Sequence, residues 1–260
     1  MTDAAKTTPR SDATELGLRA ARLLAMGAVA FALEAFLDAY RLAALLMGAF
    51  AVEFLAGKVG LRWDETGKRS MLQSLRVVGL GFALGAMSVL FVVGVGAAFG
   101  LVRVSVGAPT LVGAGMGLAM ALAQAARDEV LFRGAPLALM RDKIADRWAL
   151  PFVALLGAAP LVLQPEPSLP GIATVVVTGW IFALAWRVGK GMPLAFGAHA
   201  GWLFMMGAGT RGSLLDVSLG AGQLLPPVDA SGAIAWLALA TFVIAAVAIS
   251  VWYFRPAAQA

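Results

Sequence analysis

The sequence predicts an all-α fold, a polytopic membrane helical bundle with about eight transmembrane helices. Hydrophobic residues make up 60% of the 260 residues and charged residues only 13%, whereas an average soluble domain carries roughly 25% charged residues. The apolar residues fall in long runs, which suit helices that cross a hydrocarbon core of about 30 Å. The basic residues lie between these runs, where they act as topology signals. A membrane is therefore the main solvent of this chain.

Eight candidate spans follow from the apolar runs and the charged residues that interrupt them. They are residues 23–38, 42–57, 77–102, 110–139, 149–163, 171–186, 192–208 and 233–254. Residues 1–20 form a polar tail without the apolar region of a cleaved signal peptide, so the first span is expected to act as its own signal. Residues 21–260 are expected to form a single transmembrane domain, with a motif-bearing core at about 110–208.

Small residues recur at a spacing that lets helix backbones approach closely. The pairs are Gly81 with Gly85, Gly96 with Gly100, and Gly113 with Gly117. The longest predicted outer connection is 209–232, which we interpret as either a lid or a linker.

The basic residues also predict orientation. With the N-terminus inside, only Arg41, Arg103 and Arg211 face the outside, Arg127 and Arg133 lie within a span, and the rest of the 20 face the cytoplasm. This bias places both termini in the cytoplasm and the chain in a plasma membrane, the inner membrane of a bacterium. A reporter fusion after residue 145 tests this placement. The lipid bilayer is thus a partner, whereas the basic residues form no long block and predict no binding to nucleic acid.

The fourth span contains a cluster of charged residues, although each charge within a span costs roughly 2.5–3.5 kcal/mol. The cluster consists of Arg127, Asp128, Glu129 and Arg133. On a helix Glu129 and Arg133 share one face in the favoured order for an ion pair, whereas Asp128 points about 100° away. Asp128 is then the freer carboxylate and is suited to take a proton from water as general base. The alternative is a self-neutralised cluster that only joins helices.

The seventh span contains the one histidine of the chain, His199. It is either a hydrogen-bonded packing residue or a group that holds the attacking water or donates to a substrate carbonyl, if its helix faces the fourth span. One histidine and no cysteine exclude an HExxH or three-His zinc site. We expect no metal and no cofactor. A serine elbow of the GxSxG type is also missing, so a hydrolase based on a carboxylate and histidine remains.

At these residues the sequence resembles the CAAX prenyl protease and bacteriocin-processing family (CPBP or Abi) of glutamic-type intramembrane endopeptidases. The segment DEVLFRG at 128–134 fits the family motif EExxxR followed by a small residue, except that Asp replaces the first Glu. The segment from Arg187 to His199-Ala200 is similar to a later motif with a catalytic His. The resemblance covers about residues 110–208 and implies an eight-helix fold. It also implies a catalytic site, which consists of Asp128, Glu129, Arg133 and His199, with Asp128 activating water.

The sequence departs from the family pattern at three positions. Asp128 is one methylene shorter than Glu, and a displacement of about 1 Å can cost roughly 100-fold in rate. Pro160 stands where the family has a His, and Leu203 stands where it commonly has an Asn. The motif is therefore matched in position and altered in chemistry.

The function that these observations favour is an intramembrane endopeptidase, which cleaves a membrane-associated protein or peptide precursor. A catalytically inactive relative that binds membrane-protein tails is the main alternative. A small-molecule or ion carrier that uses Glu34, Asp38 and Glu53 with the central cluster is a third. For these three acids we prefer interface anchoring or helix pairing. If Asp128, Glu129 and His199 lie round one water-accessible cavity, the endopeptidase is favoured over both alternatives.

Overall fold

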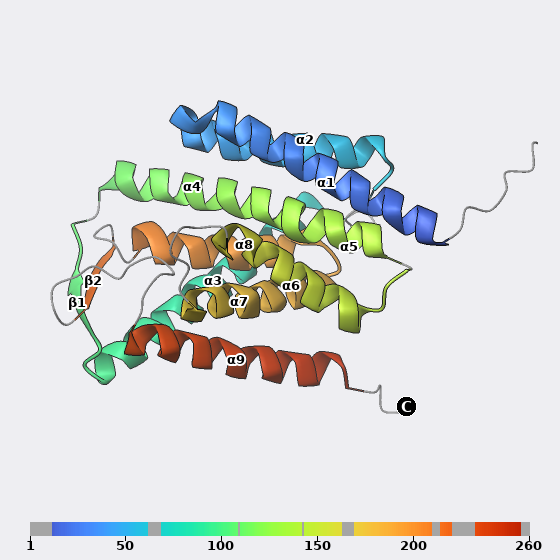
Figure 1. Cartoon of the computed structure of the whole chain (residues 1–260). Coiled ribbons are helices and arrows are strands. Elements are labelled where there is room, and N and C mark those ends of the chain that lie inside the picture. The colour runs from blue at the N-terminus through green and yellow to red at the C-terminus, as the bar shows by residue number, and fades with distance from the viewer. Residues whose placement is uncertain are drawn as a thin grey trace, which may run out of the picture.

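Helices fill almost all of the structure, a computed structural model that describes residues 12–61, 69–108, 110–141, 143–162, 169–209, 214–219 and 232–255. They lie side by side, with one short two-stranded ribbon at one end of the bundle (Figure 1). This confirms the predicted all-α class. The elements are α1 (Asp12–Phe36), η1 (Asp38–Tyr40), α2 (Arg41–Lys58), α3 (Met71–Ala98), β1 (Val102–Val106), α4 (Leu111–Glu129), η2 (Val130–Gly134), α5 (Ala135–Met140), α6 (Asp146–Val162), α7 (Leu169–Val188), α8 (Met192–Phe204), η3 (Met205–Gly209), β2 (Leu215–Leu219) and α9 (Ala233–Tyr253).

Each of the eight predicted spans coincides with a helical segment. The span at 110–139 is α4, η2 and α5 in direct succession, and the span at 192–208 is α8 followed by η3. Within the described residues, five helices are long and apolar enough to cross a membrane by length and composition: 14–36, 38–58, 71–98, 169–188 and 233–253. Of the others, α6 and α8 are shorter and α4 carries the charged cluster. The chain is an integral membrane protein.

The N-terminal end of the predicted outline differs in detail from the structure. Helix α1 begins at Asp12, so helical structure extends into the polar tail predicted at 1–20, of which residues 1–11 lie outside the described part. In Figure 1 the start of α1, the connection from α5 to α6 and the end of α9 lie at one end of the bundle, and the ribbon lies at the other. This arrangement agrees with an even number of crossings.

The two-stranded ribbon was not predicted. Strands β1 and β2 pair antiparallel, with Val102 opposite Leu219 and Val106 opposite Leu215. The third span was expected to continue to 102, but α3 ends at Ala98 and Gly100 follows with φ +70, a conformation that glycine adopts at little cost. The alternation Val-Arg-Val-Ser-Val that follows is typical of a strand. Most of the predicted lid or linker at 209–232 lies outside the described residues, apart from 214–219, which includes β2.

Glycines bring α3 and α8 into backbone contact. A Cβ atom on Gly85 would lie 1.9 Å from the carbonyl oxygen of Ala198, and one on Gly81 would lie 2.4 Å from that of Leu194. On the opposing helix, a Cβ on Gly197 or on Gly201 would lie 2.1 Å from a carbonyl oxygen of α3. The first predicted glycine pair therefore has the packing role that its spacing indicates. Gly100, by contrast, ends α3 rather than packing against a helix.

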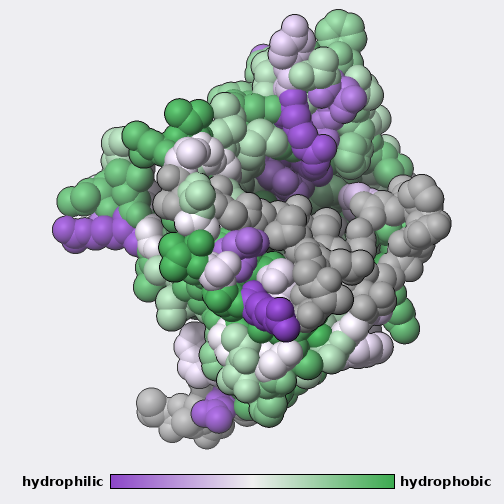
Figure 2. All heavy atoms as spheres, turned by 90° about the vertical axis from the view of Figure 1, so that its left-hand side faces the viewer, coloured by the Kyte–Doolittle hydropathy of each residue, from purple (hydrophilic) through white to green (hydrophobic). Residues whose placement is uncertain are grey.

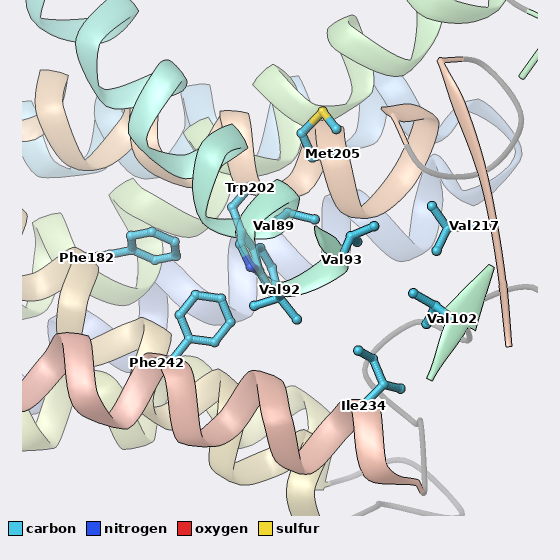
Figure 3. Packing of buried hydrophobic residues seen from close by; sticks show 10 residues of the cluster. All are labelled: Val89, Val92, Val93, Val102, Phe182, Trp202, Met205, Val217, Ile234 and Phe242. Atoms are coloured by element: carbon cyan, nitrogen blue, oxygen red, sulfur yellow. The ribbon is translucent and has the colours of Figure 1, made fainter. Parts of the chain in front are cut away.

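A hydrophobic cluster of ten buried residues joins the ribbon to the centre of the bundle (Figure 3). It consists of Val89, Val92, Val93, Val102, Phe182, Trp202, Met205, Val217, Ile234 and Phe242. The cluster takes residues from α3, α7, α8, η3, α9 and both strands, and Phe182 and Trp202 also flank His199. Burial of this cluster thus fixes the helices that surround the histidine.

Candidate active site

The two adjacent carboxylates lie where α4 changes its helical repeat. Asp128 and Glu129 are the last residues of α4, and η2 after them is a π-helical turn in which the Ala135 N–H donates to the Val130 carbonyl. Pro136 follows, and proline cannot donate the hydrogen bond that an α-helix needs at this point. Single π-helical turns are rare and frequently occur at functional sites. The sequence analysis did not foresee this turn, although Pro136 was its signal.

Glu129 is completely buried, with 0% exposure, and both of its oxygens have partners. Oε1 lies in an ion pair with Arg133 and 2.8 Å from Nδ1 of His199, and Oε2 accepts a hydrogen bond from Nε1 of Trp186. The ion pair between Glu129 and Arg133 that the helical spacing predicted is present. The guanidinium of Arg133 also lies 5.1 Å from the ring centre of Phe182, a cation–π contact. Both oxygens of the Glu129 carboxylate are therefore engaged by neighbouring side chains.

His199 points toward α4 because its neighbours occupy the opposite face of α8. Gly197 and Gly201 abut α3, and a residue two positions from each lies about 200° round the helix. The imidazole stacks on Phe182 with ring centres 4.7 Å apart and planes 21° apart. Because a carboxylate only accepts hydrogen bonds, we assign the Nδ1 proton to the bond with Glu129, which leaves Nε2 directed at Asp128.

Asp128 lies on the other side of the imidazole. Its Oδ2 is 3.9 Å from Nε2 of His199, and its Oδ1 forms an ion pair with Arg127 at 2.8 Å. Its side chain is 14% exposed, in contrast to the closed surroundings of Glu129. Asp128 is therefore the freer of the two carboxylates in its exposure, although the sequence analysis did not foresee that the neighbouring Arg127 pairs with it. Arg127 was treated only as part of the charged cluster, since adjacent residues on a helix do not usually face each other.

Three residues outside the predicted site complete it. Arg127 also pairs with Glu34 of α1 at 3.1 Å, so the first helix joins the cluster. Glu34 was expected to anchor an interface or pair helices, and it does pair α1 with α4. Trp186, at the end of α7, was missed. An acidic residue within a span usually has a partner, and this rule could have predicted the pair of Glu34 with Arg127. No pattern in the sequence connects Trp186 to Glu129.

Of the three positions that depart from the family pattern, Pro160 and Leu203 add no polar group to the site. Leu203 packs against the hydrophobic cluster of Figure 3, and Pro160 is exposed on α6. Helix α6 approaches the site through Gly157, where an added Cβ would lie 3.8 Å from Arg133 Nη2. Polar side chains from α1, α4, η2, α7 and α8 therefore form the site.

The charges of the cluster nearly balance. The carboxylates are Glu34, Asp128 and Glu129 and the guanidinium groups are those of Arg127 and Arg133, so three negative charges face two positive ones when His199 is neutral. Uptake of one proton makes the cluster neutral. Among the residues that the structure describes, no group of three or more His, Cys, Asp or Glu side chains is arranged to hold a metal ion. The cluster is thus suited to accept a proton from water.

The end of the bundle that carries the ribbon also presents polar side chains. Figure 2 looks at this face and shows hydrophilic side chains at the rim of a hollow and within it, below α1 and α2, which lie at the top of the view. Apolar side chains cover much of the remaining surface in the view. The hollow is therefore lined in part by hydrophilic side chains.

The comparison with protein families gives one match within the chain. Residues 109–205 match the family described as type II CAAX prenyl endopeptidase Rce1-like. This confirms the predicted resemblance to the CAAX protease family, over a segment that contains Asp128, Glu129, Arg133 and His199. The comparisons with curated proteins and with solved structures give no match.

Proposed function

We propose that this protein is an intramembrane endopeptidase that hydrolyses a peptide bond of a membrane-associated protein or peptide precursor. The observation that carries the proposal is that the two ring nitrogens of His199 face two different carboxylates, Glu129 at 2.8 Å and Asp128 at 3.9 Å. The match to a CAAX prenyl endopeptidase family supports the same class of reaction. A site that only tied helices together would not need an imidazole between two acids of different exposure.

The geometry suggests how water is activated. A distance of 3.9 Å between His199 Nε2 and Asp128 Oδ2 is too long for a direct hydrogen bond, but a water molecule can bridge such a gap. That water would donate one hydrogen to each group, which leaves its oxygen lone pairs free. As the oxygen adds to the substrate carbonyl carbon, Asp128 takes a proton, and the same proton then passes to the departing amine nitrogen. Glu129 does not react and holds the imidazole in place.

A binding protein without peptidase activity is the second candidate. The ion pair between Asp128 and Arg127 favours it, because it occupies one oxygen of the proposed base. The apolar residues Pro160 and Leu203 favour it too, because they remove polar groups that the family uses. In both cases we place the ends of α5 and α9 in the cytoplasm of a bacterial cell, as the distribution of basic residues predicts.

Cleavage of a co-reconstituted candidate substrate in proteoliposomes tests the proposal. We expect Asp128→Asn and His199→Ala each to lower the cleavage rate by about 100-fold or more while folded protein is retained. Asp128→Glu restores the residue of the family motif and should keep at least the original rate. The matched control is Asp38→Asn, which changes an exposed carboxylate outside the site. Full cleavage by both Asp128→Asn and His199→Ala would refute the peptidase assignment and favour the binding protein.

A further inference from the structure

A polar cavity opens at the end of the bundle where α5, α7 and α9 end and α6 begins. Its volume is about 530 Å³, and its lining residues are Arg141, Ile144, Ala145, Asp146, Arg187, Lys190 and Tyr253. Three of these residues are cationic and one is acidic. Its lining residues are not those that contact His199, and the proposed peptidase reaction does not use them.

The one carboxylate of the cavity is already engaged. Asp146 Oδ1 pairs with Arg187 Nη2 at 2.7 Å, and Asp146 Oδ2 accepts a hydrogen bond from the Tyr253 hydroxyl at 2.8 Å. These contacts tie α6, α7 and α9 together and orient the arginine. Three cations against one carboxylate leave an excess of two positive charges around the cavity. Such an excess attracts an anion.

The turn after α7 holds Lys190 in an unusual conformation. Lys190 has φ 49, the one non-glycine residue with positive φ among those that the structure describes. Arg69 Nη2 donates a hydrogen bond to the Gly189 carbonyl at 2.6 Å and so fixes this turn. A strained residue of this kind persists where its surroundings require it, and such residues cluster at ligand sites. The turn places an exposed lysine at the rim of the cavity.

Exposed tryptophans mark the depth of the cavity in the membrane. Trp148 in the first turn of α6 is 66% exposed, and Trp252 in the last turn of α9 is 59% exposed. Tryptophan is enriched at the level of the lipid headgroups. Because the same helix ends carry the lining residues Asp146 and Tyr253, the cavity lies at headgroup depth.

We propose that this cavity binds the phosphate of an anionic phospholipid from the adjacent leaflet. Arginine can bind a phosphate through two parallel hydrogen bonds, and lysine adds a point charge. Basic pockets between transmembrane helices on the cytoplasmic side suit anionic headgroups. The lining residue Arg141 lies about 20 Å along the helix from Asp128, whereas Arg187 directly follows Trp186, the partner of Glu129. A lipid headgroup therefore fits the position better than a substrate group at the scissile bond.

Titration of the purified full-length protein in detergent tests the site. Phosphatidylglycerol, phosphatidylcholine and inorganic phosphate are added separately, and bound lipid is counted by native mass spectrometry beside the shift in Tm. We expect phosphatidylglycerol to bind best. Arg141→Gln and Lys190→Gly should each weaken it by about fivefold, as expected for one basic residue near an anionic lipid. Arg147→Gln removes a charge from the same helix end but not from the cavity, so it should bind as the original protein does.

Lys190→Gly separates binding from folding, because glycine adopts positive φ readily and should leave the protein at least as stable. Retention of phosphatidylglycerol by both Arg141→Gln and Lys190→Gly would overturn the proposal. Equal binding of phosphatidylcholine, or inorganic phosphate that competes as well as the lipid, would also overturn it. A peptide whose free C-terminal carboxylate displaces the lipid, while its amide does not, would identify a peptide site instead. All these measurements of binding and stability are independent of peptidase activity.

Discussion

Two groups of polar and charged side chains meet at His199 and differ in their exposure. The closed group consists of Glu129, Arg133 and Trp186, and the open group consists of Glu34, Arg127 and Asp128. In the closed group Glu129 is 0% exposed and both of its oxygens have hydrogen-bond partners. In the open group the carboxylates and the arginine retain 13–19% exposure.

This difference in exposure indicates different roles for the neighbouring carboxylates Asp128 and Glu129. A fully buried charge is costly unless its partners are complete, so the closed group is suited to hold the imidazole in one orientation. The open group retains partial exposure, and we propose that this exposure lets it exchange a proton. Adjacent positions at the end of α4 thus combine a rigid support with a reactive group, because successive residues on a helix point in directions about 100° apart.

Among the substitutions that test this division, Glu129→Gln is expected to have the largest effect on stability. Glutamine keeps the shape but removes the charge, so Arg133 becomes a buried cation without an ionic partner. Breaking one side of a buried ion pair costs about 3–5 kcal/mol. We therefore expect a loss of that size in the free energy of unfolding, measured by denaturant titration in detergent micelles.

The matched control is Glu15→Gln. Glu15 pairs with Arg19 at the same helical spacing, but its side chain is 37% exposed. Water screens a pair that is this exposed, so it contributes little to stability, and this variant should be nearly as stable as the original protein. Similar losses in both variants would contradict the division into a closed and an open group.

A smaller effect is expected from Trp186→Phe, which removes the indole donor to Glu129. A hydrogen bond to a charged group contributes about 1.5–3 kcal/mol, and one between neutral groups about 0.5–1.5 kcal/mol. Trp180→Phe on the same helix is the control, because Trp180 donates to the hydroxyl of Ser250 at 2.8 Å. Thermal unfolding should show the greater loss for Trp186→Phe. Equal losses would mean that lost ring volume, not the bond to Glu129, determines both.

The sequence allowed most of the fold to be predicted, because apolar length and basic loops report directly on membrane crossings. It located all eight helical segments and the ion pair between Glu129 and Arg133, which depends only on helical spacing. The ribbon was missed because β1 falls at the end of a predicted span and in the connection after it, where the hydropathy pattern alone does not predict a strand.

The sequence predicted the features of the site that depend on one helix, but not those that depend on how helices pack together. That His199 faces the cluster depends on the contact of α8 with α3, and that Trp186 reaches Glu129 depends on the packing of α7. The ion pair between Arg127 and Asp128 joins neighbours in sequence, which helical geometry disfavours. The catalytic roles of Asp128, Glu129, Arg133 and His199 stay predictions, because geometry does not measure turnover.

The smallest effect concerns the open group and uses a glycine on α2. A Cβ on Gly48 would lie 3.0 Å from Glu34 Oε1 and 3.6 Å from Arg127 Cγ, so Gly48→Ala should push the Glu34 carboxylate by a few tenths of an ångström. Since a displacement of about 1 Å can cost roughly 100-fold, a shift of about 0.3 Å passed through Arg127 to Asp128 should lower kcat by about fourfold. The control is Gly57→Ala on the same helix, where an added Cβ meets nothing within 4 Å. Both variants gain the same helix propensity, so their difference in kcat isolates the contact with Glu34. An unchanged kcat in Gly48→Ala would show that Glu34 pairs helices without influencing Asp128.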